Sequence, residues 1–158
     1  MVDLIPSFIK KNVPGFKRNN KSGIPVYDVM IKEPFFISPK TSVKSCSEKI
    51  AKHNIGSMLI REEGKIIGIV TKQDLVKKVI AKGLSPSKLK VKDIMTKKLI
   101  TVNPHEDLSD AVKLMIDNKV EQLPVTEKTE FKGLLTWKQI LKIQPKLMEL
   151  YFEKCKMM

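Results

Sequence analysis

Val26-Tyr27-Asp28-Val29-Met30 returns 65 residues later as Val91-Lys92-Asp93-Ile94-Met95, and Gly68-Ile69-Val70-Thr71 returns at the same interval as Gly133-Leu134-Leu135-Thr136. The apolar positions between these motifs keep the interval without an insertion, as three pairs show: Pro39 and Pro104, Val43 and Leu108, Ile60 and Val125. A constant period of this kind indicates that one structural unit has been duplicated. Two such units facing each other across a pseudo-twofold axis would form two related clefts, so we expect function at the interface between the repeats.

The composition is that of a globular chain, and we expect it to stay in the cytoplasm. The sequence has 158 residues, of which 42% are hydrophobic, enough for a substantial core. No apolar run reaches the roughly 18 to 20 residues of a membrane span, and the first residues lack the pattern of a secretory signal. The two cysteines predict reduced thiols, and neither histidine has a second ligand nearby in the sequence, so we expect no metal site.

The chain is strongly basic, which raises the question of polyanionic partners. It holds 30 lysines and arginines against 17 aspartates and glutamates, a formal net charge of +13. Most of the lysines alternate with apolar residues, which is typical of solvated helix faces. The segment 10–23 is different because it carries five basic residues and no acid. We interpret residues 1–23 as a basic N-terminal arm or linker.

Each repeat is expected to have the element order β-α-β-β-α, in an α/β (α+β) fold. The first repeat spans 24–83, a linker spans 84–90, the second repeat spans 91–144, and a C-terminal helix or tail spans 145–158. Asp107 is the expected cap of a helix in the second repeat, and Thr41 or Ser42 caps its copy in the first. Strands are expected at 35–37, 57–61 and 66–70, with a tight turn at Gly64, and the second hairpin at 122–126 and 131–135.

Two further helices close the repeats. The first is predicted over 72–82 and ends at Gly83. Its spacing predicts that four apolar side chains are buried: Leu75, Val76, Val79 and Ile80. The second starts near Trp137, and Pro145 either kinks it or opens another helix through Leu150 and Tyr151.

Thr71 and Asp74 form the strongest candidate for binding chemistry. A carboxylate in the first turn of a helix after a buried strand can accept hydrogen bonds from two hydroxyls, which suits a ribose cis-diol, and the helix start suits a phosphate. The spacing also fits a helix cap in which Thr71 and Asp74 only stabilise the helix. The repeat context favours the binding interpretation.

The Asp-hydrophobic-Met opening, the proline after the first strand and the ending Gly-hydrophobic-hydrophobic-Thr-x-x-Asp together resemble a tandem pair of CBS domains, the cystathionine-β-synthase type module. The resemblance covers about residues 24–144. It implies two β-α-β-β-α repeats packed sheet to sheet, frequent dimerisation, and ligand sensing rather than catalysis. It also implies adenosine-containing ligands, such as AMP, ADP, ATP or S-adenosylmethionine, as regulatory ligands rather than catalytic cofactors.

The resemblance further implies two composite clefts. The first would be formed by Ile69, Thr71, Asp74, Lys98, Leu99, Ile100, Gln122, Leu123 and Pro124. There Leu99 and Ile100 would cover an adenine ring, and Lys98 would approach a phosphate. The second cleft would be formed by Phe35, Phe36, Ser57, Met58, Leu134, Thr136 and Gln139. Because an amide is a weaker acceptor than a carboxylate, Gln139 predicts that this second cleft binds less strongly.

Three functional hypotheses follow from the sequence. The leading one is a non-enzymatic regulatory module, expected to be a homodimer, that senses an adenosyl ligand and signals to a separate protein. An enzyme is not favoured, because the sequence has no phosphate-binding loop motif and no nucleophile paired with a base. The alternatives are a nucleic-acid-binding protein that uses its basic surface, and a dimerisation module with empty clefts.

Overall fold

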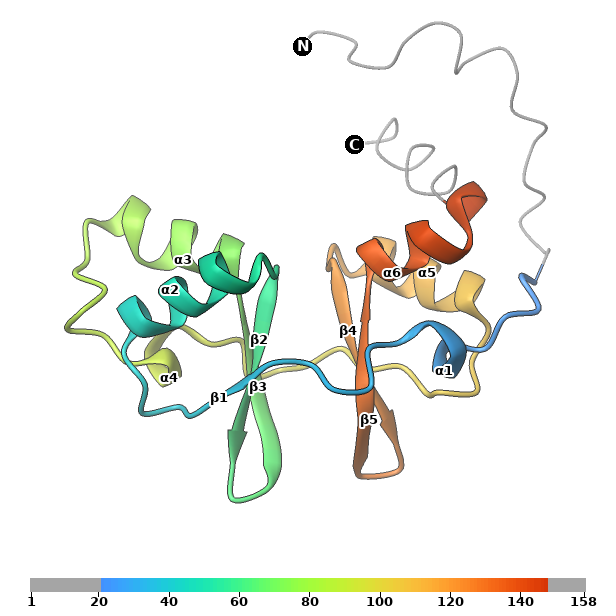
Figure 1. The fold of residues 1–158 in the computed structure, drawn as a ribbon, viewed down its shortest axis with the longest axis horizontal. Coiled ribbons are helices and arrows are strands. Elements are labelled where there is room, and N and C mark those ends of the chain that lie inside the picture. Colours follow the sequence, from blue (N-terminus) through green and yellow to red (C-terminus); the bar gives the residue numbers. More distant parts are fainter. Residues whose placement is uncertain (1–20, 148–158) are drawn as a thin grey trace, which may run out of the picture. The chain divides into compact units, whose positions relative to one another are not determined.

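The computed structural model describes residues 21–147, which fold into two compact units (Figure 1). Unit 2 consists of residues 32–101, and unit 1 contains the described residues before 32 and after 101. These units do not coincide with the sequence repeats, because the opening segment of each repeat belongs to the unit that holds the rest of the other repeat. The predicted arm 1–23 is described only from Lys21 onward; its earlier residues lie outside the described range.

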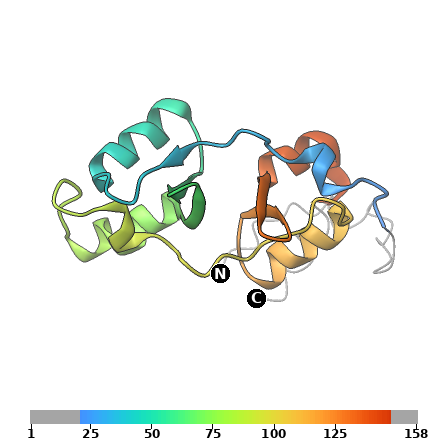
Figure 2. The same cartoon turned by 90° about the horizontal axis from the view of Figure 1, so that it is seen from below.

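Unit 2 contains a three-stranded sheet and the helices that accompany it. Its elements are β1 (Phe36–Ile37), α2 (Val43–His53), β2 (Ser57–Glu62), β3 (Lys65–Thr71), α3 (Lys72–Lys78), the 3-10 helix η1 (Ile80–Lys82) and α4 (Val91–Ile94). Strand β1 runs parallel to β2, and β2 pairs antiparallel with β3. Helices α2 and α3 lie on the same side of this sheet (Figures 1 and 2). The hairpin turn has Glu63 at φ 49° and Gly64 at φ 79°, which confirms the tight turn predicted at Gly64.

Unit 1 repeats this plan with a smaller sheet. Its elements are α1 (Val26–Val29), α5 (Leu108–Asp117), β4 (Gln122–Glu127), β5 (Glu130–Thr136), α6 (Trp137–Ile143) and the 3-10 helix η2 (Pro145–Leu147). Pro145 opens η2, while Leu150 and Tyr151 lie outside the described residues.

The three-stranded sheet implied by the family resemblance is complete only in unit 2. In unit 1 the strands β4 and β5 form a two-stranded sheet, and the third strand is reduced to one parallel bridge between Val102 and Val125. In unit 2 the Leu59 N–H donates to the Phe35 carbonyl over 3.0 Å. The position equivalent to Leu59 is Pro124, which has no N–H, so the corresponding ladder bond cannot form.

Backbone hydrogen bonds fix each opening segment in its unit. In unit 2 the Val91 N–H donates to the Thr41 carbonyl, and the Val43 N–H donates to the Leu89 carbonyl, both over 2.9 Å. In unit 1 the Val26 N–H donates to the Glu106 carbonyl over 2.9 Å. The short helices α1 and α4 therefore each pack against the helix and hairpin of the other sequence repeat.

The two motifs that recur along the chain meet in space within each unit. A Cβ added at Gly68 would lie 2.9 Å from Met95 Sδ and 3.0 Å from the Thr96 carbonyl oxygen. A Cβ added at Gly133 would lie 2.7 Å from both Met30 Sδ and the Ile31 carbonyl oxygen. Glycine is needed at both positions because an opening segment crosses its strand too closely for a side chain.

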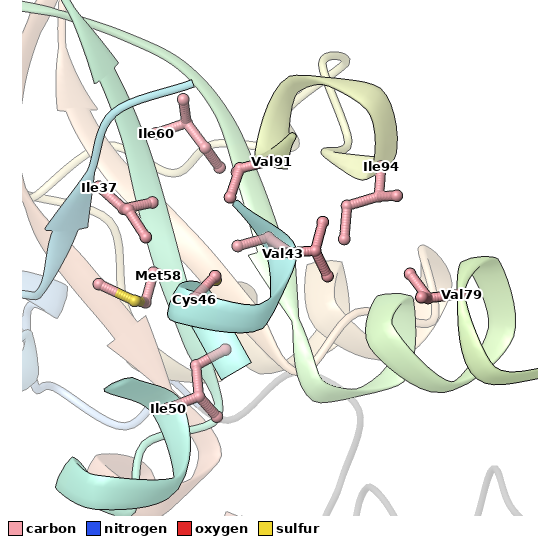
Figure 3. Close-up of a cluster of buried hydrophobic side chains, with 10 residues drawn as sticks. Ile37, Val43, Cys46, Ile50, Met58, Ile60, Val79, Val91 and Ile94 are labelled. Atoms are coloured by element: carbon pink, nitrogen blue, oxygen red, sulfur yellow. The ribbon is translucent and has the colours of Figure 1, made fainter. Parts of the chain in front are cut away.

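The core of unit 2 combines side chains from both sequence repeats (Figure 3). Helix α2, the sheet, the end of α3 and α4 contribute its members: Ile37, Val43, Cys46, Ile50, Met58, Ile60, Val70, Val79, Val91 and Ile94. Cys46 is fully buried, and this burial raises the pKa of its thiol to about 11 against an opposing effect of Lys49. At neutral pH the thiol is therefore protonated and packs as a small apolar side chain.

The predicted helix over 72–82 is shorter than expected. Helix α3 ends at Lys78, and Gly83, at φ 65°, ends the 3-10 helix that follows. Val79 is buried as predicted and Leu75 is half-buried, but Val76 is 58% and Ile80 64% exposed, so the predicted burial of these last two is wrong. For Ile80 the physical reason is the change of helix type at Val79, which rotates the later side chains off the buried stripe, whereas Val76 lies within α3 on its exposed side.

The predicted caps of the two longer helices are confirmed. The Ser42 hydroxyl accepts a hydrogen bond from the Ser45 N–H at the start of α2, and Asp107 accepts one from the Ser109 N–H at the start of α5. Within 21–147, no helix combines the length and apolar character needed to cross a membrane.

Candidate functional site

The Thr71–Asp74 pair forms a reciprocal cap at the start of α3. The Asp74 N–H donates to Thr71 Oγ1 over 3.1 Å, while Asp74 Oδ2 accepts hydrogen bonds from the Thr71 N–H and hydroxyl, each over 2.9 Å. The capping interpretation of this spacing is thus confirmed. It does not exclude ligand binding, because an ionised carboxylate has about four acceptor positions and the cap uses two of them.

Lys78 occupies the other oxygen of the same carboxylate. Its Nζ lies 2.7 Å from Asp74 Oδ1, and the Asp74 side chain is only 13% exposed. The same ammonium donates to the Ile94 carbonyl over 2.7 Å and to Thr96 Oγ1 over 3.3 Å. Lys78 therefore connects the candidate carboxylate to the opening segment of the second sequence repeat.

The strand before Thr71 holds this opening segment directly. The Thr96 N–H donates to the Ile69 carbonyl over 2.8 Å, and the Ile69 N–H donates to the Thr96 carbonyl over 3.1 Å. Three predicted site residues, Lys98, Leu99 and Ile100, follow Thr96 within two to four positions. Six of the nine residues predicted for the first cleft therefore belong to unit 2, where one backbone bridge ties their two segments together.

Unit 1 contains a weaker counterpart of this arrangement. Thr136 is the residue before α6, but its side chain accepts no capping hydrogen bond; its hydroxyl instead donates to Gln139 Oε1. The position equivalent to Lys78 is Ile143, which is 53% exposed. Unit 1 thus has neither the carboxylate nor the ammonium at this place.

The strand register places one further predicted residue beside each threonine. Ser57 on β2 pairs with Thr71, and Gln122 on β4 pairs with Thr136. Ser57 is buried. Gln122 Oε1 is a buried acceptor for which no hydrogen-bond donor is found within the described part of the chain. An unpartnered buried oxygen costs free energy, so an N–H or O–H donor from a water molecule or a ligand would be favoured at Gln122.

The remaining predicted residues occupy strands or their ends. Phe36 lies on β1 and Met58 on β2, while Phe35 precedes β1, is 42% exposed and stacks on His53 with ring centroids 4.5 Å apart. Leu123 and Pro124 are buried on β4, and Leu134 is buried on β5. Each predicted cleft draws residues from both units, so the complete groupings stay predictions.

Lys78 is the candidate site residue that the sequence predictions did not include. Its signal was the Asp74–Lys78 spacing of four, at which opposite charges on a helix commonly pair. Thr96 was missed as well, because its pairing with Ile69 is a tertiary contact without a local sequence pattern.

Within residues 21–147, no group of three or more His, Cys, Asp or Glu side chains is arranged so that it could hold a metal ion.

The end of the basic arm is attached to helix α5. Asp107 Oδ1 accepts hydrogen bonds from the Ser22 N–H over 3.0 Å and the Ser22 hydroxyl over 2.9 Å, and Asp107 Oδ2 accepts one from the Gly23 N–H over 2.8 Å. Burial raises the pKa of Asp107, but the hydrogen bonds donated by Ser109 and Ser22 outweigh it and hold that pKa well below its usual value. Lys21 pairs with Asp110 on the same helix.

Solved structures share this architecture, and a relative shares part of the sequence. The chain is 35% identical over 121 residues to an uncharacterized protein of Methanopyrus kandleri; the match covers 75% of this chain and 62% of that protein, so the chain spans less than two thirds of this relative. A crystal structure of an uncharacterized conserved protein from Pyrococcus horikoshii has a TM-score of 0.71 and 28% identity, covering 75% of this chain and 89% of that one.

A second solved structure is the CBS domain pair of protein MJ0100 in complex with 5'-methylthioadenosine and S-adenosyl-L-methionine. It has a TM-score of 0.68 and 26% identity, with 76% of this chain and 94% of that chain covered. The family model for the CBS domain matches twice, at residues 18–81 and 91–146. The chain therefore belongs to the CBS-domain family, as a pair of such domains.

Proposed function

We propose that this CBS pair is a regulatory module that binds an adenosine-containing ligand at Asp74 in unit 2. The observation that carries the proposal is the Asp74 carboxylate, which is largely buried, oriented by Thr71 and accompanied by Lys78. A buried, oriented carboxylate is a strong acceptor for the two hydroxyls of a ribose. The module is proposed to signal to a separate protein rather than to catalyse a reaction.

The surroundings of Asp74 favour an anionic ligand. Lys78 contacts the carboxylate, and Lys97 and Lys98 follow the bridge between Thr96 and Ile69. Leu99 and Ile100 are half-buried apolar side chains that would cover a base. The solved complex of protein MJ0100 supports an adenosyl ligand in this family. AMP, ADP, ATP and S-adenosylmethionine remain the candidates.

Thermal unfolding of the full chain with each of these four ligands tests the proposal. A ligand at 100 times its Kd stabilises the native state by about 2.7 kcal/mol, which raises Tm by about 5–10 °C in a protein of this size. We expect such a shift for at least one adenosyl ligand and a loss of it in Asp74→Asn. The 2'-deoxy form of that ligand should bind about tenfold or more weakly, because it lacks one hydroxyl donor to the carboxylate.

Asp93→Asn is the matched control. Asp93 is also a first-turn carboxylate of unit 2, and its Oδ2 accepts the Lys90 N–H over 2.8 Å. Removing its charge should leave the ligand-induced shift unchanged. No shift with any of the four ligands, or an equal loss of the shift in both variants, would contradict a ribose site at Asp74.

A nucleic-acid ligand is the second candidate function, and the distribution of charge favours it. Residues 32–101 contain 16 basic and 6 acidic residues, whereas the rest of the chain contains 14 and 11. The excess of positive charge is therefore concentrated in unit 2. Phosphate-dominated binding would weaken steeply as salt increases.

Binding of a fluorescent oligonucleotide at several salt concentrations tests this second candidate. Lys77→Gln should weaken binding, whereas Lys142→Gln, at the equivalent position 65 residues later in unit 1, should have little effect. Equal effects of the two substitutions would contradict an interface on unit 2.

A homodimer and a cytoplasmic location also stay predictions. Light scattering tests the first, and cell fractionation tests the second.

A further inference from the structure

Lys78 joins two parts of unit 2 that are far apart in the sequence. Asp74 Oδ1 and the Ile94 carbonyl each lie 2.7 Å from its Nζ, and Thr96 Oγ1 lies 3.3 Å away. An ammonium has three N–H donors, so these three acceptors use all of them. One acceptor belongs to the proposed ligand site, and the other two belong to the end of α4 and the residues that follow it.

The acceptors on the second part belong to the end of α4 and to the residues of the backbone bridge that follows it. The Ile94 carbonyl lies in the last turn of the four-residue helix α4, where carbonyls have no intrahelical partner. Thr96 is exposed, and it is held to β3 by its two backbone hydrogen bonds with Ile69. The cation of Lys78 therefore adds a charged side-chain contact to the backbone bridge that holds this segment.

We propose that Lys78 is a positioning residue that transmits the state of the Asp74 carboxylate to the segment Ile94–Thr96. With the carboxylate bare, the ammonium is drawn to Asp74 and holds the segment against α3. A diol that donates to Asp74 Oδ1 competes with Lys78 for the same oxygen and weakens this hold. The inference rests on the proposed function, since the carboxylate concerned is the proposed ribose acceptor.

Unit 1 provides an internal comparison for this coupling. There Ile31 and Leu134 form the equivalent backbone bridge, with distances of 2.8 and 2.9 Å, but Gln139 and Ile143 replace the carboxylate and the ammonium. The same bridge therefore exists once with the charged connection and once without it. Changes at Asp74 or Lys78 should alter the first bridge and leave the second unchanged.

The test is amide hydrogen exchange of the full chain, measured by NMR without ligand. Asp74→Asn, which keeps an oxygen for the cap, and Lys78→Met, which keeps the apolar stem, should each accelerate exchange at the Thr96 and Ile69 amides by about three- to tenfold. The double variant should exchange no faster than either single one, because both remove the same connection. Lys77→Met, with the same charge change on the neighbouring residue, should have no effect.

Three results of this comparison of single and double variants would overturn the inference. The first two are additive effects of the two substitutions and no acceleration of exchange in Asp74→Asn. The third is equal acceleration at the Ile31 and Leu134 amides, because it would reveal a general loss of stability. These measurements need no ligand, so they decide the coupling even if no adenosyl compound binds.

Titration with adenosine then tests the competition at the carboxylate. Adenosine carries the diol without a phosphate, so removal of the Lys78 charge does not remove a phosphate contact. Lys78→Met should bind adenosine about three- to tenfold more tightly than the wild type, since linkage is reciprocal. Weaker adenosine binding by Lys78→Met would overturn the competition between Lys78 and the diol but would leave the ribose site intact. If the wild type binds no adenosyl compound, that result refutes the proposed function alone.

Discussion

The ends of β3 and β5 have the same backbone but different chemistry. Both strands end at a threonine that precedes a seven-residue helix, and both are bridged to an opening segment. In unit 2 the helix carries Asp74 and Lys78, which pair over 2.7 Å. In unit 1 the equivalent residues are Gln139 and Ile143. Both units therefore form the bridge, and unit 1 forms it without the charged pair.

The steric requirement of the bridge can be compared between the units as well. An alanine at position 133 would meet the Ile31 carbonyl at 2.7 Å, a backbone atom that cannot move alone. An alanine at position 68 would meet the Met95 sulfur at 2.9 Å, in a flexible side chain that can partly move away, and the backbone carbonyl of Thr96 only at 3.0 Å. The crossing in unit 1 is therefore the tighter of the two.

The largest effect is expected from substitutions at these glycines. Gly133→Ala should reduce the free energy of unfolding by about 2–3 kcal/mol and Gly68→Ala by about 1–2 kcal/mol, because overpacking forces the backbone to shift. Urea unfolding followed by circular dichroism measures both values. A combination with Met95→Val should recover part of the loss in Gly68→Ala, whereas Met30→Val should recover little in Gly133→Ala. Equal recovery in the two pairs would refute the difference between the crossings.

The second-largest effect is expected from substitutions that transfer the charged pair from unit 2 to unit 1. Gln139→Asp together with Ile143→Lys recreates the Asp74–Lys78 chemistry on the equivalent backbone. If the carboxylate is the ribose acceptor, adding these two substitutions to Asp74→Asn should raise the affinity for the adenosyl ligand about tenfold over Asp74→Asn alone. This increase corresponds to about 1.4 kcal/mol of binding free energy. Isothermal titration calorimetry measures it.

The position equivalent to Lys98 limits this transfer. It is Glu33, an acid, so a phosphate-bearing ligand should gain less from the transfer than adenosine does. The matched control is Gln139→Asn, which changes the side chain without adding charge. No gain for any ligand would show that the backbone of unit 1 does not support the site.

The repeat made most of the fold predictable from the sequence. The caps Ser42 and Asp107 and the turn at Gly64 depend on local chemistry, and the structure has each of them. Gly83 does end a helix, but it is the 3-10 helix η1 rather than the predicted helix over 72–82. The predicted capping alternative for Thr71 and Asp74 was local too. Signals of this kind lie within a few residues of each other, so a single sequence contains them.

The features that were missed depend on contacts between distant segments. Nothing local indicates that Val91 and Ile94 complete the core around Val43, or that Lys78 reaches the Ile94 carbonyl. The exposure of Ile80 follows a change of helix type that the apolar spacing does not reveal, and Val76 lies on the exposed side of α3. Pro124 does carry a readable signal, since a proline inside a strand removes a donor and so weakens the third strand of its sheet.

The smallest effect compares the two helix caps and depends on pH. Ser42→Ala and Asp107→Asn remove a cap acceptor or its charge at equivalent positions, and each should cost about 1 kcal/mol at pH 7. The pKa of Asp107 is lowered in the folded state, so its charge stabilises the protein above the ordinary aspartate value of about 3.9, and this stability is lost as pH falls through the lower folded value. The difference in Tm between wild type and Asp107→Asn should therefore be constant from pH 7 to about 5 and shrink below about 4.

Ser42→Ala is the control for this pH dependence. The difference in Tm between wild type and Ser42→Ala should not change with pH, because a hydroxyl does not titrate in this range. A pH-independent cost for Asp107→Asn would mean that Ser22 and Gly23 are held by the geometry of the loop rather than by the charge of Asp107.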